Sequence, residues 1–194
     1  MQTKSLLNGV DLTKFVQTIE AMIKKPELGK YQFRVNNQWL DGGYNQSVIK
    51  DFLVAGEEDT IREVPFILSS DEPDALLGND HAPSPVEFIL HALAGSLTTS
   101  LVYHAAARGY EISKIETEIE GRLDMRGYLG IDNWVRKGFE EITVSFDIEG
   151  SVSEEEKKEI LKLTSFSPVF DIITNPVPVK IKLDVKEPAE LIDC

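Results

Sequence analysis

Residues 84–109 read SPVEFILHALAGSLTTSLVYHAAARG, and this stretch decides the fold. It begins with helix-start signals, because Ser84 can cap, Pro85 suits the first helical position and Glu87 completes a Ser-x-x-Glu capping box. Its end is marked by Gly109, since a glycine there readily takes the left-handed cap conformation. Between these ends the stretch is apolar nearly all round, which predicts a buried helix.

The middle of this helix is built of small side chains, which would let another element approach it closely: Ala92, Ala94, Gly95, Ser96, Thr99 and Ser100. A stretch of this length comes close to the roughly 20 apolar residues that span a bilayer. Two histidines, His91 and His104, lie inside it, and ordinary acidic sequence surrounds it. We therefore interpret it as the central core helix of a globular protein with no membrane partner.

Composition limits the function classes. The chain has 194 residues, of which 42% are hydrophobic and 27% are charged, which is ordinary for one globular domain. Its net charge of −13 argues against nucleic acid or an anionic membrane as a partner. Its single cysteine, Cys194, allows no intramolecular disulfide. The first nine residues lack the apolar core of a signal peptide, so we expect a cytoplasmic protein.

The flanking sequence predicts helices and strands in separate groups. Apolar residues at helical spacing predict a helix over 11–25 with Asp11 as its cap, and a second capping box at Ser153 opens another helix, followed by a short one over 169–174. Alternation predicts strands over 31–35, 47–54, 64–68, 112–123, 139–148 and 177–185, with a turn region over 36–45 and loops over 69–83 and 126–138. We expect a first hairpin from the strands over 31–35 and 47–54, and antiparallel pairing of 112–123 with 139–148. This order indicates an α+β fold with mostly antiparallel sheets.

Three local patterns resemble the OsmC/Ohr family, the osmotically inducible protein C and organic hydroperoxide reductase group. The stretch from Pro85 to Thr98 is similar to the family's Pro-Glu-x-Leu-x-x-Ala-Leu-x-x-Cys helix. Ser167-Pro168-Val169 is similar to the family's Cys-Pro-Val, and Asn175-Pro176-Val177-Pro178-Val179 to its last strand entry. Each pattern alone is weak, but the three occur together in the family's order over residues 30–185.

The resemblance implies the overall organisation of the molecule. It implies an intertwined homodimer in which antiparallel sheets wrap around buried central helices. We accordingly expect a single domain over 1–194, with an N-terminal helical extension over 1–29, an OsmC-like core over 30–185 and a polar tail over 186–194.

The resemblance also implies a chemistry, namely thiol-dependent reduction of organic hydroperoxides in oxidative stress defence. The family's attacking cysteine corresponds to Ser96 and its resolving cysteine to Ser167. The family's helix-start glutamate falls at Val86, with Glu87 one place later, and the family's first-hairpin arginine has no obvious counterpart, since Arg34 lies before the turn. Serine cannot pass through sulfenic acid and disulfide states, so we expect peroxidase activity to be reduced or absent. The candidate site residues are Ser96, Ser167 and Glu87.

The sequence also contains residues that fit other kinds of site less well. A Ser/His nucleophilic pair from Ser96 with His91 or His104 lacks both a Gly-x-Ser-x-Gly elbow and an acidic partner. No metal or cofactor is expected, since the three histidines lack ligand spacing: His81, His91 and His104. Glu87 serves the capping box and could also act in the site. The alternative function is a non-enzymatic binding module, with a small apolar or lipid-like ligand in the dimer pocket near Ser96 and Ser167.

Overall fold

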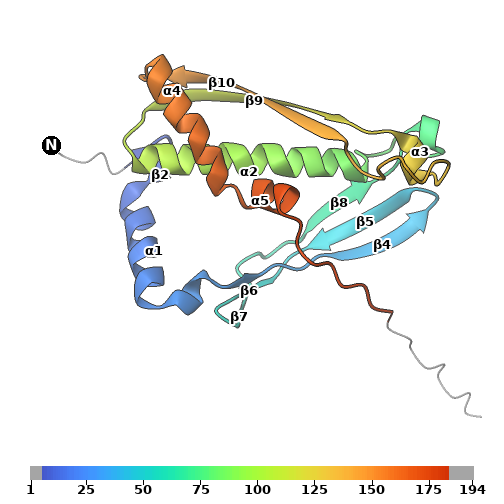
Figure 1. The fold of residues 1–194 in the computed structure, drawn as a ribbon. Coiled ribbons are helices and arrows are strands. Elements are labelled where there is room, and N and C mark those ends of the chain that lie inside the picture. The colour runs from blue at the N-terminus through green and yellow to red at the C-terminus, as the bar shows by residue number, and fades with distance from the viewer. Residues whose placement is uncertain (1–5, 184–194) are drawn as a thin grey trace, which may run out of the picture.

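The computed structural model describes residues 6–183 (Figure 1). The elements follow one another along the chain as β1 (Leu6–Leu7), β2 (Val10–Asp11), α1 (Leu12–Lys24), η1 (Pro26–Gly29), β3 (Tyr31–Gln32), β4 (Asn36–Asp41), β5 (Tyr44–Ile49), β6 (Phe52–Val54), β7 (Glu57–Asp59), β8 (Phe66–Ser70), η2 (Asp74–Leu76), α2 (Pro85–Ala107), β9 (Ile112–Arg122), α3 (Met125–Tyr128), β10 (Glu141–Gly150), α4 (Glu154–Leu161), η3 (Lys162–Phe166) and α5 (Pro168–Thr174). Helices and antiparallel strands form separate groups, so the predicted α+β class is confirmed.

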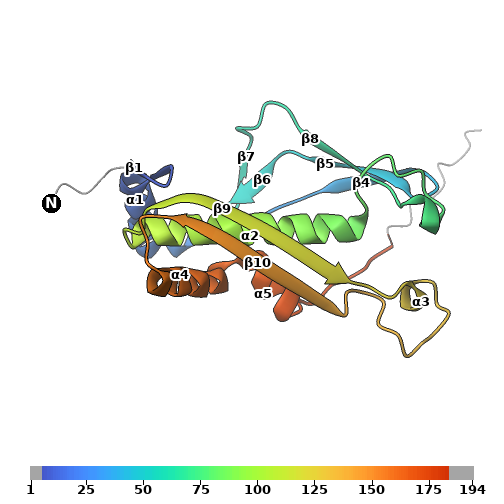
Figure 2. The ribbon, with the colours of Figure 1, turned by 90° about the horizontal axis from the view of Figure 1, so that it is seen from above.

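Helix α2 runs through the middle of the molecule (Figure 1). The β9–β10 hairpin lies along one side of it, and α4, η3 and α5 lie along another (Figure 2). The sheet β4-β5-β8 stands beside the N-terminal half of α2, and α1 lies at its C-terminal end. A shorter sheet has the order β3-β6-β7.

The predicted ends of α2 are confirmed. The Glu87 carboxylate accepts hydrogen bonds from the backbone N–H of Ser84 at 2.7 Å and from its hydroxyl at 2.8 Å, which completes the capping box. At the other end Gly109 has a φ of +81°, the left-handed conformation that a terminating glycine adopts at little cost.

The structure buries α2 on one face only, whereas its sequence predicts burial all round. The buried side chains recur at helical spacing, as Leu93, Leu97, Leu101, Ala105 and Ala106. On another face Gly95 is open, since a Cβ built there would meet no atom within 4 Å. Within residues 6–183 the other elements cover only part of the helix, and Ala92, Gly95 and Thr99 are exposed where they do not.

Length and composition alone would allow α2 to cross a membrane. In this fold it is instead the element against which the β9–β10 hairpin and the C-terminal helices pack. The core cluster joins four elements, with Leu101 and Ala105 on α2, Ile148 on β10, Ile160 on α4 and Leu163 on η3. One apolar face of α2 is therefore used for packing within the chain.

The second half of the chain follows its sequence pattern closely. Strands β9 and β10 pair antiparallel, with Val144 opposite Ile119 and Ile148 opposite Ile115. Helix α4 begins with the predicted capping box, in which Ser153 and Glu156 exchange hydrogen bonds. The prediction of a loop over 126–138 is partly wrong, because the first residues of this range belong to the short helix α3, which Asp124 caps.

Substitution of the α4 cap should lower stability measurably. For Ser153→Ala we expect the free energy of unfolding to fall by about 1 kcal/mol, because the Glu156 N–H loses its acceptor at the helix start. Urea unfolding followed by circular dichroism measures this loss. Ser151→Ala, outside the box, is the matched control, and equal losses in both variants would contradict the assignment.

The first hairpin is confirmed, but its predicted boundaries are wrong. The turn region predicted over 36–45 is mostly strand, because the polar side chains there bond across the ladder, with Asn37 donating to Asn45 and Ser47. Of the strand predicted over 31–35, only the two residues of β3 form a strand. The return strand predicted over 47–54 is broken at Lys50 and Asp51. Its second part, β6, pairs with β3 as predicted, and also with the unpredicted β7.

The helix predicted over 11–25 is confirmed as α1, with Asp11 as its cap. Two strand predictions differ from the structure. The strand predicted over 64–68 begins and ends two residues later, as β8. The strand predicted over 177–185 is not formed over 177–183, where no strand of the described chain lies alongside to accept its hydrogen bonds. Val179, Ile181 and Leu183 are accordingly exposed. Val185 and the polar tail predicted over 186–194 lie outside the described residues.

Candidate functional site

The two predicted site serines lie in direct contact. Ser96, midway along α2, and Ser167, at the start of α5, are 71 positions apart, and their Oγ atoms are 2.8 Å apart. Ser167 is buried, with 1% of its surface exposed, and Ser96 is partly buried. The structure therefore brings together the two positions at which the sequence resemblance places a pair of cysteines.

Local sequence explains the position of Ser167. Pro168 occupies the first turn of α5, and the Ser167 hydroxyl accepts a hydrogen bond from the Phe170 N–H at 3.1 Å, as an N-cap does. The Val169 N–H points to Ser96 Oγ at 3.4 Å, so the start of α5 contacts both serines. Residue 167 thus caps a helix and belongs to the site at the same time.

A second contact holds this segment on α2. Phe166, next to Ser167, stacks its ring on His104 with 4.0 Å between ring centroids. The guanidinium of Arg108 lies 5.6 Å from the centre of the same ring. Residues 166 and 167 are therefore attached to α2 at two places about two turns apart, which fixes the distance between the serine hydroxyls.

No histidine is positioned to activate either serine. Within residues 6–183 the hydrogen-bond partners of Ser96 Oγ are the Ser167 hydroxyl and the Val169 N–H. His104 Nδ1 faces the Arg108 guanidinium at 3.4 Å instead. Burial, and then the charge of Arg108, lower the pKa of His104, so its ring is neutral near pH 7. Ser96 and His104 therefore do not form a Ser/His pair.

Glu87 remains at the start of α2 and does not reach the serines. At about 1.5 Å of rise per residue it lies about 13 Å from Ser96 along the helix axis. Hydrogen bonds from the Ser84 N–H and hydroxyl lower its pKa and keep the carboxylate at the cap. Its position explains the capping role and places no carboxylate beside the serine pair.

A cavity of about 470 Å³ opens between α2 and the sheet β4-β5-β8. Its lining is mostly apolar with a few polar groups: Val35, Asn45, Ser47, Ile49, Leu68, Ser70, Pro85, Phe88, His91 and Ala92. Ala92 precedes Ser96 by one helical turn, so both lie along the same side of α2. Its lining contains neither Ser96 nor Ser167, and its composition is typical of small-molecule sites.

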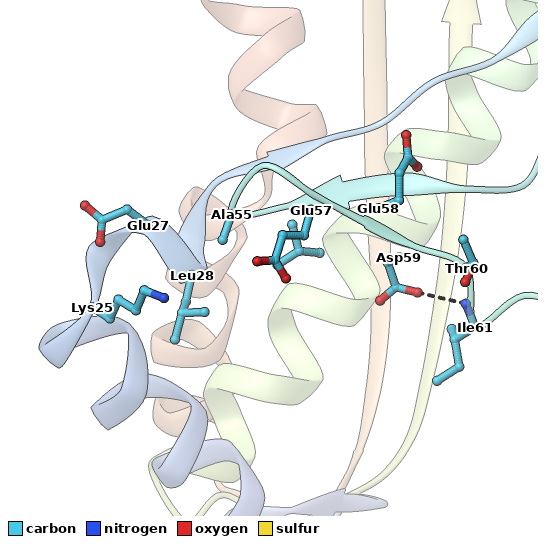
Figure 3. Close-up of a pocket in the computed structure, with 10 residues that line it drawn as sticks. Lys25, Glu27, Leu28, Ala55, Glu57, Glu58, Asp59, Thr60 and Ile61 are labelled. Carbon is cyan, nitrogen blue, oxygen red and sulfur yellow. Dashed lines mark hydrogen bonds between the residues drawn. The ribbon is translucent and has the colours of Figure 1, made fainter.

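A larger, open pocket of about 740 Å³ lies elsewhere, between η1 and the β6–β7 turn. Figure 3 shows Glu57 beside Leu28 in this pocket and Glu58 pointing away from it. Glu58 is paired with Arg34. In the described part of the chain no group of three acidic, histidine or cysteine side chains is arranged to hold a metal. This pocket contains neither site serine.

Sequence reasoning missed a buried carboxylate, Asp71, which has no exposed surface. It accepts hydrogen bonds from the N–H groups of Glu72 at 2.8 Å and of Asn79 and His81 at 3.2 Å. Burial alone would raise the pKa of Asp71, but these three hydrogen bonds outweigh burial and hold it below its ordinary value. A single aspartate in a polar loop gives no sequence signal for this role.

Acid should unfold the protein through its carboxylates. The pKa is lowered at Asp71 and Glu87, and at Asp124 it falls to about 2, chiefly through hydrogen bonds from Arg126. A carboxylate whose pKa is lower in the folded chain than in the unfolded chain stabilises the fold only at pH values above its unfolded-state pKa. This contribution to the free energy of unfolding is complete at neutral pH, and it is lost as the pH falls below the ordinary pKa values of 3.8 and 4.5.

The urea midpoint measured at a series of pH values tests this expectation. It should stay level from neutral pH to just above those ordinary values and fall below them. At neutral pH the urea midpoint of Asp71→Asn should be lower than that of the parent chain. It should also fall by less when the pH is lowered. A midpoint in the parent chain that does not change below the ordinary values would contradict the assignment.

The comparisons with known proteins agree with this geometry. The sequence model of the family described as OsmC-like protein matches residues 78–182, which is more than half of the chain, and the chain therefore belongs to this family. The matched range contains both serines and α2. The search of curated proteins gave no match.

Solved structures share the fold at low sequence identity. An OsmC-like protein from Mycoplasma pneumoniae aligns with a TM-score of 0.57 and 17% identity, over 75% of this chain and 89% of that one. An organic hydroperoxide resistance protein OsmC from Legionella pneumophila aligns with a TM-score of 0.52 and 16% identity, over 76% and 94%. The chain therefore has the OsmC fold.

Proposed function

We propose that this protein belongs to the hydroperoxide-resistance branch of oxidative stress defence, and that its thiol peroxidase activity is reduced or absent. The observation that carries the proposal is the 2.8 Å contact between Ser96 Oγ and Ser167 Oγ, at the two positions where the family resemblance places cysteines. The Legionella pneumophila structure of the same fold, described as an organic hydroperoxide resistance protein, supports the substrate class.

The chemistry of the two side chains explains the loss. In a thiol peroxidase, a thiolate attacks the peroxide O–O bond, releases the alcohol and becomes a sulfenic acid. A second thiol then displaces water and forms a disulfide, which an external dithiol reduces. A serine hydroxyl has no accessible oxidation states of this kind and is barely ionised at neutral pH, so neither step proceeds at Ser96 or Ser167.

Hydroperoxide consumption by the purified chain tests this proposal. With an organic hydroperoxide and dithiothreitol, the rate should equal that of dithiothreitol alone. The same assay with Cys194→Ser shows whether the single native thiol contributes. Turnover well above background that survives Cys194→Ser would contradict the thiol argument and require another mechanism.

A homodimer is part of the proposal. The described residues leave apolar surface uncovered, at the open face of α2 around Gly95 and at the exposed side chains of Val179 and Ile181. A second copy of the chain that covered this surface would remove it from water. Light scattering should give twice the mass of 21.7 kDa, and a monomer mass at micromolar concentration would contradict this part.

A binding module remains the second candidate, because a specific cavity favours it. The mostly apolar cavity of about 470 Å³ along α2 could hold a small apolar or lipid-like ligand without any reaction at Ser96. Mass spectrometry of material extracted from the purified, cytoplasmically expressed protein tests it. A stoichiometric apolar compound supports this function, and a clean extract argues against it.

A further inference from the structure

A separate cavity of about 300 Å³ lies at the N-terminal end of α2, enclosed by two loops. One loop contributes the segment around Pro73 and Leu76, and the other contributes residues 123–137. The apolar side chains that line it are Leu76, Val86, Leu123, Met125 and Tyr128. Its lining contains neither Ser96 nor Ser167, and Val86 lies about 15 Å from Ser96 along the axis of α2.

Both loops are fixed by their own backbone contacts. In the first, the buried Asp71 carboxylate binds three N–H groups, and Gly78 packs directly against the carbonyl of Glu72. In the second, Gly127 packs so closely on the backbone of Arg136 that a Cβ would collide with it. The walls of the cavity are therefore formed before any ligand arrives, which lowers the entropic cost of binding.

The positively charged side chains near this cavity differ in whether they form ion pairs within the described range. Arg122 and Arg126, which come from the same part of the chain, are paired with Glu141 and Asp124. Lys137 lines the cavity and forms no ion pair with any residue in the range 6–183. Glu72 also lines the cavity but is not within ion-pair distance of Lys137. In a chain of net charge −13, an unpaired lysine beside an apolar cavity is available to an anionic group.

We propose that this cavity binds a small amphipathic monocarboxylate, with its apolar body between the loops and its carboxylate on the Lys137 ammonium. A volume of about 300 Å³ equals that of roughly ten water molecules, and so suits a ligand of roughly ten non-hydrogen atoms. Met125 and Tyr128 favour an aromatic body, because thioether sulfur and aromatic rings attract one another. This site does not depend on the chemistry of the serine pair.

The methionines provide a reporter inside the cavity. The chain has three, and Met125 lines the cavity while Met22 lies on α1. With methyl-¹³C methionine, a titration with 3-phenylpropionate should shift the Met125 signal saturably and leave the Met22 signal unchanged. Assignment comes from Met125→Leu. A Met125 signal that does not move overturns the proposal.

A charge test separates the specific site from simple apolar binding. Lys137→Met keeps the apolar stem and removes the charge, and Arg136→Met is the matched control one residue away, outside the lining. Lys137→Met should weaken 3-phenylpropionate binding fivefold or more and change binding of the uncharged 3-phenylpropanol less than twofold. Arg136→Met should change neither by more than twofold.

Each remaining outcome counts against the proposal. Equal effects of Lys137→Met and Arg136→Met would indicate general electrostatic attraction, and equal losses for the acid and the alcohol would indicate a structural effect. Lys137 is exposed, so the variant should keep its melting temperature, which circular dichroism checks. Shifts at Met22 matching those at Met125 would indicate non-specific binding.

Discussion

Ser96→Cys combined with Ser167→Cys is expected to create hydroperoxide turnover, raising the rate over the parent chain by roughly a hundredfold or more, a small part of the about 10⁶-fold acceleration typical of enzymes. The expectation rests on the 2.8 Å between the two Oγ atoms, because side chains this close need little movement to form a disulfide of about 2.05 Å. The assay follows loss of cumene hydroperoxide with dithiothreitol, in a Cys194→Ser background.

The single and displaced variants define the mechanism. Ser96→Cys alone should be oxidised by peroxide without forming an intramolecular disulfide, and Ser167→Cys alone should be nearly inactive. Ser100→Cys with Ser167→Cys, which moves the first thiol one helical turn, is the matched control and should stay at background. Intact mass spectrometry should show a loss of two hydrogens only in the Ser96/Ser167 double variant. Equal activity in the displaced pair would contradict the site.

The residue at position 86 limits the hydroperoxide turnover expected of the double cysteine variant. The family resemblance places a glutamate there, and the structure has Glu87 engaged with Ser84 instead. Arg34, which lies before the turn of the first hairpin, is paired with Glu58. The new thiol at position 96 would therefore lack the charged groups that lower its pKa, and turnover should rise with pH as the thiolate fraction grows.

Leu101→Ala is expected to lower the free energy of unfolding by about 2–5 kcal/mol. Leu101 has no exposed surface and lies in the core cluster with Ala105, Ile148 and Ile160. Removing its side chain leaves a cavity where α2 meets the β9–β10 hairpin and α4. Urea unfolding, fitted with a common slope for parent and variant, measures the loss.

Leu77→Ala is the matched control for this substitution. Leu77 is 93% exposed, so the same chemical change there should alter stability by less than about 0.5 kcal/mol. Comparable losses at the two positions would contradict the assignment of the core. A large loss at Leu101 with retained secondary structure at low urea would confirm it.

Local signals were enough to predict the elements that hold the site. The capping boxes at Ser84 and Ser153 and the alternation of β9 and β10 depend on neighbours in sequence, so a single sequence contains them. The contact between positions 96 and 167 was expected only through the family resemblance, because no periodicity relates residues 71 positions apart.

The remaining features depend on partners distant in the chain or absent from it. Strand β4 is polar, and only its cross-strand hydrogen bonds at Asn37 reveal it. The alternation over 177–183 is a strand pattern without a neighbouring strand in the described chain. Asp71 becomes important only because its loop closes around it.

The open face of α2 has a consequence for how stability should be measured. With a second copy as the cover that we propose, folding and association become one equilibrium, and unfolding releases two chains for each native particle. The melting temperature then rises with protein concentration, and dilution alone favours the unfolded chain. The abundance of the protein in the cell would in that case be one of the determinants of its fold.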